Sequence, residues 1–127
     1  MTIDEEEHKK KDSWIPSSGP MPRPDNIKQA RETLKEERFD APNCNEVEFR
    51  TNEFTSICPK SGQPDFSTVI INYVPDEYCI ESKSLKFYLW AFREYKGFCE
   101  TITSQIADDI VKAIDPKRVK VTIKQNV

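Results

Sequence analysis

The amino-acid sequence predicts an α+β fold in which one antiparallel sheet carries two helices on the same face. From residue 45 onward the elements follow the order β-β-α-α-β, and isoleucine recurs every fourth residue between positions 102 and 114. The last predicted strand alternates apolar with polar or basic residues, which is typical of a half-buried strand, whereas the isoleucine spacing is typical of a helix. Placing both helices on one face buries these apolar surfaces together.

We divide the chain into a tail (residues 1–24), an N-terminal helix with its linker (25–44) and a domain (45–127). The tail joins a run of charged residues to a proline-rich stretch, and we expect it to be disordered because it cannot bury an apolar face. Asp25 is the expected N-cap of the first helix, which is amphipathic and runs to about Glu37.

Two strands begin the domain. Val47 to Ile57 shows partial alternation of apolar residues, and Phe66 to Tyr73 is rich in β-branched residues. The segment 58–65 contains two prolines and a glycine, and therefore reads as the loop that joins them.

Two helices and a strand complete the pattern. The first helix is expected from Ser82 to Tyr95, where Lys96-Gly97 ends it, and the second from about Glu100 to Ile114. Asp115-Pro116 stops the second helix, and residues 119–123 alternate as a strand.

Composition excludes several classes of protein. The 127 residues carry a net charge of −3, which argues against a general nucleic-acid binder. The three glycines are too far apart for a dinucleotide or Walker loop, and the single histidine, His8, leaves no Ser-His-Asp or histidine-bearing zinc site. Since no membrane span or secretory segment is visible, we expect a cytoplasmic protein with reduced cysteines and no metal.

Cys58 is the candidate nucleophile. It follows the first strand, at a turn that would hold its side chain at the surface, and Asp65 lies across that turn. The thiolate is the reactive form of cysteine, so Lys60 would favour it while Asp65 exchanged a proton. The alternative is a loop cysteine without function beside a turn aspartate.

The start of the helix at Ser82 is a candidate anion site. Lys83 and Lys86 leave the same face of its first turn, Ser82 and Ser84 add hydroxyl donors, and a helix N-terminus has unpaired N–H groups. Because the helix dipole disfavours lysine there, a bound phosphate would explain the placement. The alternative is a solvated helix start.

Glu100, which follows Cys99, is a candidate recognition carboxylate. A fixed carboxylate accepts both N–H donors from the amidine edge of a purine-like ligand. The helix dipole by itself also favours a carboxylate at that position, so a purely structural role is the alternative.

Two of these segments together resemble a known family. Residues 54–66 (FTSICPKSGQPDF) resemble the nucleophile segment of the NADPH-dependent 7-cyano-7-deazaguanine reductases, the QueF-type nitrile reductases of queuosine synthesis. Residues 81–88 (ESKSLKFY) match that family's NADPH-associated signature throughout, at the family's separation from the first segment. The resemblance covers roughly residues 46–121.

The resemblance implies a tunnelling fold whose subunits pair their sheets into a ring-like homo-oligomer, with active sites between subunits. It implies that Cys58 attacks the nitrile of the 7-deazapurine to form a thioimide, that Asp65 donates or relays a proton, and that two NADPH molecules then reduce it to the aminomethyl product. The other implied contacts are Ile80, Glu81, Ser82, Cys99 and Glu100 for the substrate, and Lys83, Ser84 and Lys86 for NADPH.

The chain departs from the family pattern in two places. Cys99 stands where the family usually has a histidine, a residue that would supply a proton for the reduction. Family members usually continue through an Arg-Gly-Gly segment and a further strand, so we expect either that this chain is truncated or that its sheet lacks one edge strand.

Two alternatives stay open. The first is an archaeal-type relative that forms the same thioimide but adds ammonia to a nitrile carried on tRNA, which the absent histidine favours. The second is a non-catalytic tunnelling-fold protein that binds a purine or pterin through Glu100.

Overall fold

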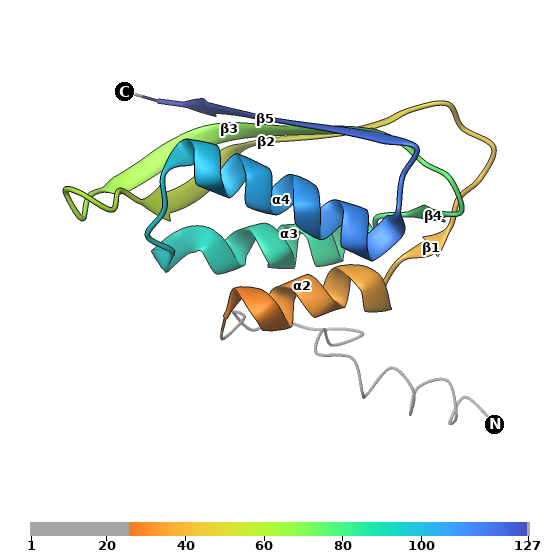
Figure 1. Ribbon diagram of the computed structural model, residues 1–127, viewed down its shortest axis with the longest axis horizontal. Helices are drawn as coiled ribbons and strands as arrows, with labels where there is room; N and C mark the ends of the chain where they lie inside the picture. The colour runs from red at the N-terminus through yellow and green to blue at the C-terminus, as the bar shows by residue number, and fades with distance from the viewer. Residues whose placement is uncertain (1–25, 127) are drawn as a thin grey trace.

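The computed structural model describes residues 26–126, so the predicted tail lies outside the described residues (Figure 1). In chain order the elements are helix α2 (Ile27–Glu36), strands β1 (Phe39–Asp40), β2 (Val47–Ile57), β3 (Pro64–Val74) and β4 (Tyr78–Cys79), helix α3 (Ser82–Trp90), the 3-10 helix η1 (Ala91–Glu94), helix α4 (Cys99–Ile114) and strand β5 (Arg118–Gln125). The predicted α+β order of strands and helices is confirmed.

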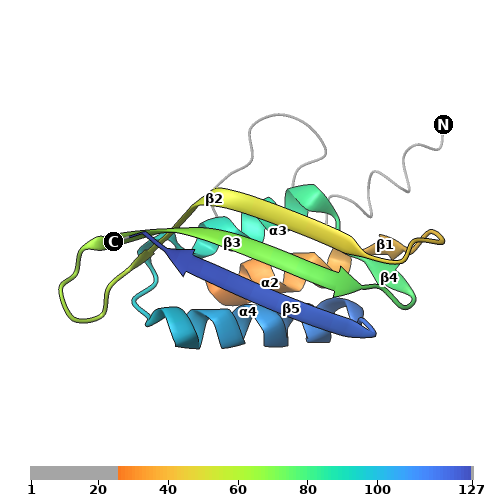
Figure 2. The same ribbon diagram turned by 90° about the horizontal axis from the view of Figure 1, so that it is seen from above.

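The described elements form three layers, which Figures 1 and 2 show from two sides. The first layer is an antiparallel sheet with the strand order β2-β3-β5. Helices α3 and α4 cover one face of this sheet, as predicted, and α2 packs on the outer side of these two helices. The core therefore lies between the sheet and the helices, and continues between the helices and α2.

A β-bulge explains why the apolar alternation in β2 is only partial. The pairing moves from Thr51 opposite Val69 to Phe54 opposite Ser67, so β2 contains one extra residue between these pairs. The extra residue shifts the alternation, and Phe49 and Phe54 therefore both pack against the core although five positions separate them.

The helices α3 and α4 bury the apolar rows that the sequence predicts. The isoleucines of α4 at 102, 106, 110 and 114 are each at most 1% exposed, and Phe92 packs edge-on against Tyr88. The first of the two helices ends earlier than predicted, because the chain tightens into η1 after Trp90. Asp115 ends α4 in the left-handed region with φ of 43°, directly before Pro116.

Helix α2 is part of the same core. Its N-cap is Asn26 rather than the predicted Asp25, since the Asn26 side chain accepts a hydrogen bond from the N–H of Gln29 at 2.8 Å. Ala30 and Leu34 are fully buried. The described residues on both sides of the boundary predicted near residue 45 thus share one core.

A buried polar cluster joins the three helices. The carboxylate of Asp109 in α4 is fully buried and lies 2.7 Å from Nε of Arg31 in α2. The same carboxylate accepts a hydrogen bond from the Tyr88 hydroxyl of α3 at 2.5 Å and from the Gln105 amide at 3.1 Å. Since a buried charge must be paired, this cluster fixes how α2 sits on α3 and α4.

One small element was not predicted from the sequence. The two-residue strands β1 and β4 pair with each other, with Phe39 opposite Cys79. This ribbon leads into Ile80, whose N–H donates to the hydroxyl of Tyr73 at 3.0 Å. It thereby fixes where α3 begins.

Candidate functional site

Cys58 lies in the loop that joins β2 to β3. Its N–H donates to the carbonyl of Gln63 at 2.9 Å, and its own carbonyl accepts from the N–H of Gly62 at 3.0 Å. Gly62 has φ of 73°, a conformation that a residue with a Cβ rarely adopts. The loop therefore folds back on itself and leaves the Cys58 side chain partly exposed, as predicted.

The surroundings of Cys58 favour the thiolate. Hydrogen bonds from the Ser61 hydroxyl, and from the backbone N–H groups of Ser61 and Lys60, lower the pKa of the Cys58 thiol below its ordinary value. Partial burial and the negative charge of Asp65 oppose this change, and their combined effect is the smaller one. The predicted role of Lys60 thus comes from its backbone, and Ser61 is a contributor that the sequence analysis missed.

Replacing Ser61 with alanine is expected to raise the pKa of the Cys58 thiol, because its main hydrogen-bond donor is lost. The rate of Cys58 alkylation by iodoacetamide should then fall several-fold at neutral pH, where less thiolate remains. At about pH 10, where the Cys58 thiol is ionised in both the variant and the parent, the two alkylation rates should agree. Peptide mass spectrometry measures the rate at Cys58, and Ser104→Ala, on the exposed surface of α4, is the matched control. Equal rates for Ser61→Ala and the parent at neutral pH would contradict this account.

Asp65 lies across the hairpin from the end of β2, where it pairs with Ser56. Its side chain lines a small crevice together with Cys99 of α4. Its negative charge raises the pKa of both thiols, Cys58 and Cys99, so the carboxylate is near enough to influence both. Asp65 therefore has the position expected of a group that exchanges protons beside the candidate nucleophile.

Two hydrogen bonds bring the start of α4 to the end of β2. The N–H of Ile57 donates to the carbonyl of Tyr95 at 2.9 Å, and the N–H of Gly97 donates to the carbonyl of Ile57 at 3.2 Å. A Cβ on Gly97 would lie 2.6 Å from the Tyr95 ring, so this close approach needs glycine. Cys99 and the exposed Glu100, as the first residues of α4, thus lie at the same end of the molecule as Cys58.

Cys99 has a different environment from Cys58. Burial is the main reason that the pKa of its thiol is raised, with smaller contributions from the charges of Glu100 and Asp65. Cys99 is therefore protonated at neutral pH, whereas Cys58 has the larger thiolate fraction. Of the two thiols at this end of the molecule, Cys58 is the better nucleophile.

The start of α3 is organised differently from the predicted anion site. Glu81 is the N-cap, and its carboxylate accepts the N–H of Lys83 at 2.7 Å and the N–H of Ser84 at 2.8 Å. The Ser84 hydroxyl is buried and donates to the carbonyl of Glu81. These N–H groups and this hydroxyl already have partners within the chain, so an anion here would have to bind through the neighbouring side chains.

The predicted site residues fall into two groups within one chain. Cys58, Asp65, Cys99 and Glu100 lie at the hairpin end of the molecule, whereas the segment 80–86 lies at and beyond the start of α3, next to β4 (Figure 1). The nine residues of α3 alone span about 13 Å between these two ends. A single chain therefore does not bring Ile80, Glu81 and Ser82 together with Cys58.

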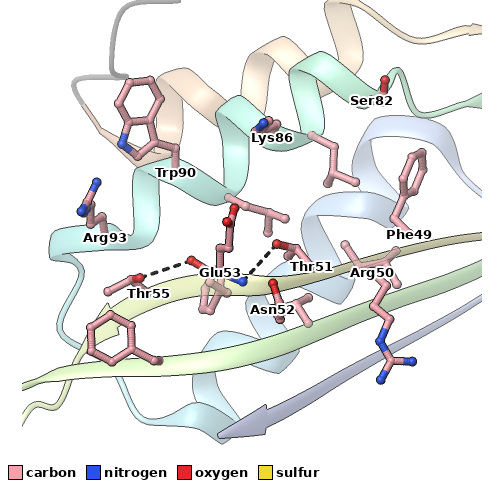
Figure 3. Close-up of a pocket in the computed structure, with 16 residues that line it drawn as sticks. Phe49, Arg50, Thr51, Asn52, Glu53, Thr55, Ser82, Lys86, Trp90 and Arg93 are labelled. Carbon is pink, nitrogen blue, oxygen red and sulfur yellow. Dashed lines mark hydrogen bonds between the residues drawn. The ribbon is translucent and has the colours of Figure 1, made fainter. Parts of the chain in front are cut away.

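A groove of about 1010 Å³ lies between β2 and α3 (Figure 3). Its floor includes the bulge of β2, where the Glu53 backbone is hydrogen-bonded to the hydroxyls of Thr51 and Thr55. Its wall is the face of α3 and η1 that carries Ser82, Lys86, Leu89, Trp90 and Arg93. Of the three predicted NADPH residues, Lys86 lines this groove.

Trp90 and Arg93 were not singled out from the sequence. Both follow Lys86 on the same face of the chain, at four and seven positions. The helical spacing that grouped the lysines could have been extended to them, although the matching signature ends at residue 88. Their position on a groove wall becomes visible only when β2 is placed opposite α3.

Within residues 26–126, no group of three or more histidine, cysteine or acidic side chains is arranged to hold a metal ion. No helix there combines the length and apolar character that crossing a membrane requires.

Comparison with known proteins identifies relatives over most of the described residues. Residues 64–126 match the model of the family described as "QueF-like protein". The NADPH-dependent 7-cyano-7-deazaguanine reductase of Alkalilimnicola ehrlichii is 54% identical over 76 residues, which are 60% of this chain and 59% of that protein. The protein of the same name from Halorhodospira halophila is 44% identical over 94 residues, which are 72% of this chain and 80% of that protein.

One solved structure shows the same fold. The apo form of an archaeosine synthase, described as QueF-Like, matches with a TM-score of 0.64 at 23% identity, over 68% of this chain and 85% of that one. This match supports the tunnelling fold. The chain spans 59% and 64% of the length of the first two curated relatives, so it corresponds to part of those proteins.

Proposed function

Because the chain belongs to the QueF family of NADPH-dependent 7-cyano-7-deazaguanine reductases, we propose that it reduces the nitrile of 7-cyano-7-deazaguanine to an aminomethyl group. The observation that carries this proposal is the environment of Cys58, a partly exposed thiol with a lowered pKa and a carboxylate, Asp65, close by. This combination suits covalent capture of a weak electrophile at neutral pH.

The chemistry follows from these groups. The Cys58 thiolate attacks the nitrile carbon, a C–S bond forms, and Asp65 delivers a proton to the nitrile nitrogen to give a thioimide. NADPH, when bound, supplies hydride ions to the carbon. Hydride addition at the thioimide carbon would let the C–S bond break, so that Cys58 leaves as a thiolate and an imine remains, and a second hydride together with a proton would give the amine. In sum, one nitrile, two NADPH and two protons give one aminomethyl group and two NADP⁺.

The groove beside α3 fits a dinucleotide in size and charge. Its volume of about 1010 Å³ lies at the upper end of the range for ligand sites. Lys86 and Arg93 are the basic residues on its α3 side, whereas the guanidinium of Arg50 points away from α3 (Figure 3). Glu53 is the acidic residue among those that line it. We therefore assign NADPH to this groove, with Lys86 as one of its ligands.

We also propose that a second copy of the chain completes the substrate site. Ile80, Glu81 and Ser82 are distant from Cys58 within one chain, so they can reach a substrate bound at Cys58 only from a neighbouring copy. Both β2 and β5 are edge strands within the described residues, which gives each copy two edges for pairing into a ring. Glu100 would then accept the N–H donors of the base next to Cys58.

The test combines intact-mass analysis with NADPH oxidation. The protein mixed with 7-cyano-7-deazaguanine is expected to gain the mass of one substrate, and added NADPH should remove this adduct while being oxidised. An assembled protein that forms no adduct would overturn the proposal. An adduct that persists in the presence of NADPH would instead favour the amidine-forming alternative. The motive for this alternative is Cys99, which stands where the family usually has a proton-donating histidine and whose thiol has a raised pKa.

A further inference from the structure

The wall of the groove carries two basic side chains with an aromatic ring between them. Lys86, Trp90 and Arg93 lie on one face of α3 and η1, because positions three and four apart along a helix are neighbours. Lys86 and Arg93 are exposed, whereas Trp90 is half-buried. Figure 3 shows all three on the α3 and η1 side of the groove, with the Trp90 ring pointing away from β2.

We propose that Arg93 binds the 2′-phosphate of NADPH, that Trp90 stacks on the adenine, and that Lys86 binds the pyrophosphate. This inference rests on the proposed function and adds to it the residues that distinguish NADPH from NADH. The two cofactors differ only in the 2′-phosphate, so a residue that binds this group sets the preference. Neither Trp90 nor Arg93 belongs to the signature of residues 81–88.

The chemistry of the three side chains fits this order. A guanidinium offers a planar pair of donors to a terminal phosphate, whereas an ammonium acts as a point charge and suits the pyrophosphate. An indole provides a flat, apolar surface for a base, as in other sites where bases stack. Lys86 and Arg93 are about 10 Å apart along the helix, a distance that their long side chains can adjust to two phosphates on one adenosine.

The charge of the groove favours this occupant. Lys86 and Arg93 on the α3 wall outnumber Glu53, the acidic residue that lines the groove, whose carboxylate extends from β2 toward α3. The groove therefore carries an excess of positive charge along α3, which suits an anionic ligand. The other possible occupant is the second copy itself, if its pairing along the β2 edge fills the groove rather than borders it, and the experiment below distinguishes the two.

The experiment measures binding of two nucleotides to the whole chain by titration calorimetry. Adenosine 2′,5′-bisphosphate carries the 2′-phosphate and adenosine 5′-monophosphate does not. We expect Arg93→Gln to weaken binding of the bisphosphate about tenfold or more and to change binding of the monophosphate less than about twofold. Arg93→Lys should give an intermediate loss. Lys112→Gln, an exposed position on α4 outside the groove, should leave both affinities unchanged.

A fluorescence measurement tests the stacking. The chain has two tryptophans, so Trp14→Phe leaves Trp90 as the single emitter. Both nucleotides are expected to quench its emission, and Arg93→Gln should shift the quenching midpoint for the bisphosphate alone. A monophosphate that binds without quenching Trp90 would overturn the stacking assignment.

The outcomes separate this inference from the proposed function. If the protein forms the Cys58 adduct and oxidises NADPH but Arg93→Gln lowers both nucleotide affinities equally, Arg93 does not read the 2′-phosphate and the inference is wrong. If the active protein binds neither nucleotide, the groove does not hold the adenosine half of the cofactor and the inference is also wrong. If bisphosphate binding depends on Arg93 but no adduct forms, the cofactor site stands and the proposed reduction fails.

Discussion

Cys58→Ala is expected to abolish both the covalent adduct and the oxidation of NADPH. The alanine has no atom that can form the C–S bond, so the reduction would have to start from the free nitrile. We expect a loss of about 10³-fold or more in the rate, as is usual when a covalent nucleophile is removed. Intact-mass spectrometry measures the adduct, and the absorbance of NADPH measures the rate.

The matched control for this variant is Cys44→Ala, a second partly exposed cysteine that lies outside the hairpin. It should retain the adduct and the activity. An adduct that persists in Cys58→Ala and maps to Cys99 would show that the second thiol at the same end of the molecule is the nucleophile, in spite of its raised pKa.

Asp109→Ala is expected to cost the protein about 3–5 kcal/mol of stability, because it leaves the partly buried Arg31 without its charge partner. The Tyr88 hydroxyl also loses its acceptor. Burial together with the Asp109 carboxylate raises the pKa of Tyr88, so this hydroxyl stays protonated and needs that acceptor. Urea unfolding followed by circular dichroism gives the change in the free energy of unfolding.

Asp108→Ala is the matched control, since Asp108 is the preceding residue of the same helix and is exposed. Its effect should stay within about 0.5 kcal/mol. If Asp109→Ala does not fold, Tyr88→Phe removes a single hydrogen bond and should cost about 1–2 kcal/mol. A loss of less than about 1 kcal/mol for Asp109→Ala would mean that the cluster does not hold the helices together.

The sequence predicts those parts of the fold that rest on local periodicity. The isoleucines of α4 and the alternation of β5 each determine an element and its buried face without knowledge of the rest of the chain. The β1–β4 ribbon has two residues in each strand and therefore too little pattern to detect. The packing of α2 on the two other helices depends on the pairing of Arg31 with Asp109, two positions far apart in the sequence.

The candidate site also contains some features that local sequence predicts and others that depend on the folded structure. The closeness of Cys58 and Asp65 could be predicted because both lie in one short hairpin. The hydrogen bonding of Ser61 to Cys58 depends on how the loop folds around the thiol, and the proposed role of Arg93 depends on which wall of the groove it occupies. Ser84 belongs to the matching signature, yet its hydroxyl is used inside the helix, because a pattern of residue types does not state which side chains face outward.

The central position of β3 in the sheet has a kinetic consequence. Its pairing with β2 closes only the short loop 58–63, whereas its pairing with β5 must close the whole segment between Val74 and Arg118. The entropy of loop closure grows with length, so we expect the hairpin to form early and β5 to dock after α3 and α4 have condensed. Slowed refolding in Val69→Ala with unchanged refolding in Val121→Ala would identify this order, and the hairpin that holds Cys58 would then be among the first parts of the chain to take shape.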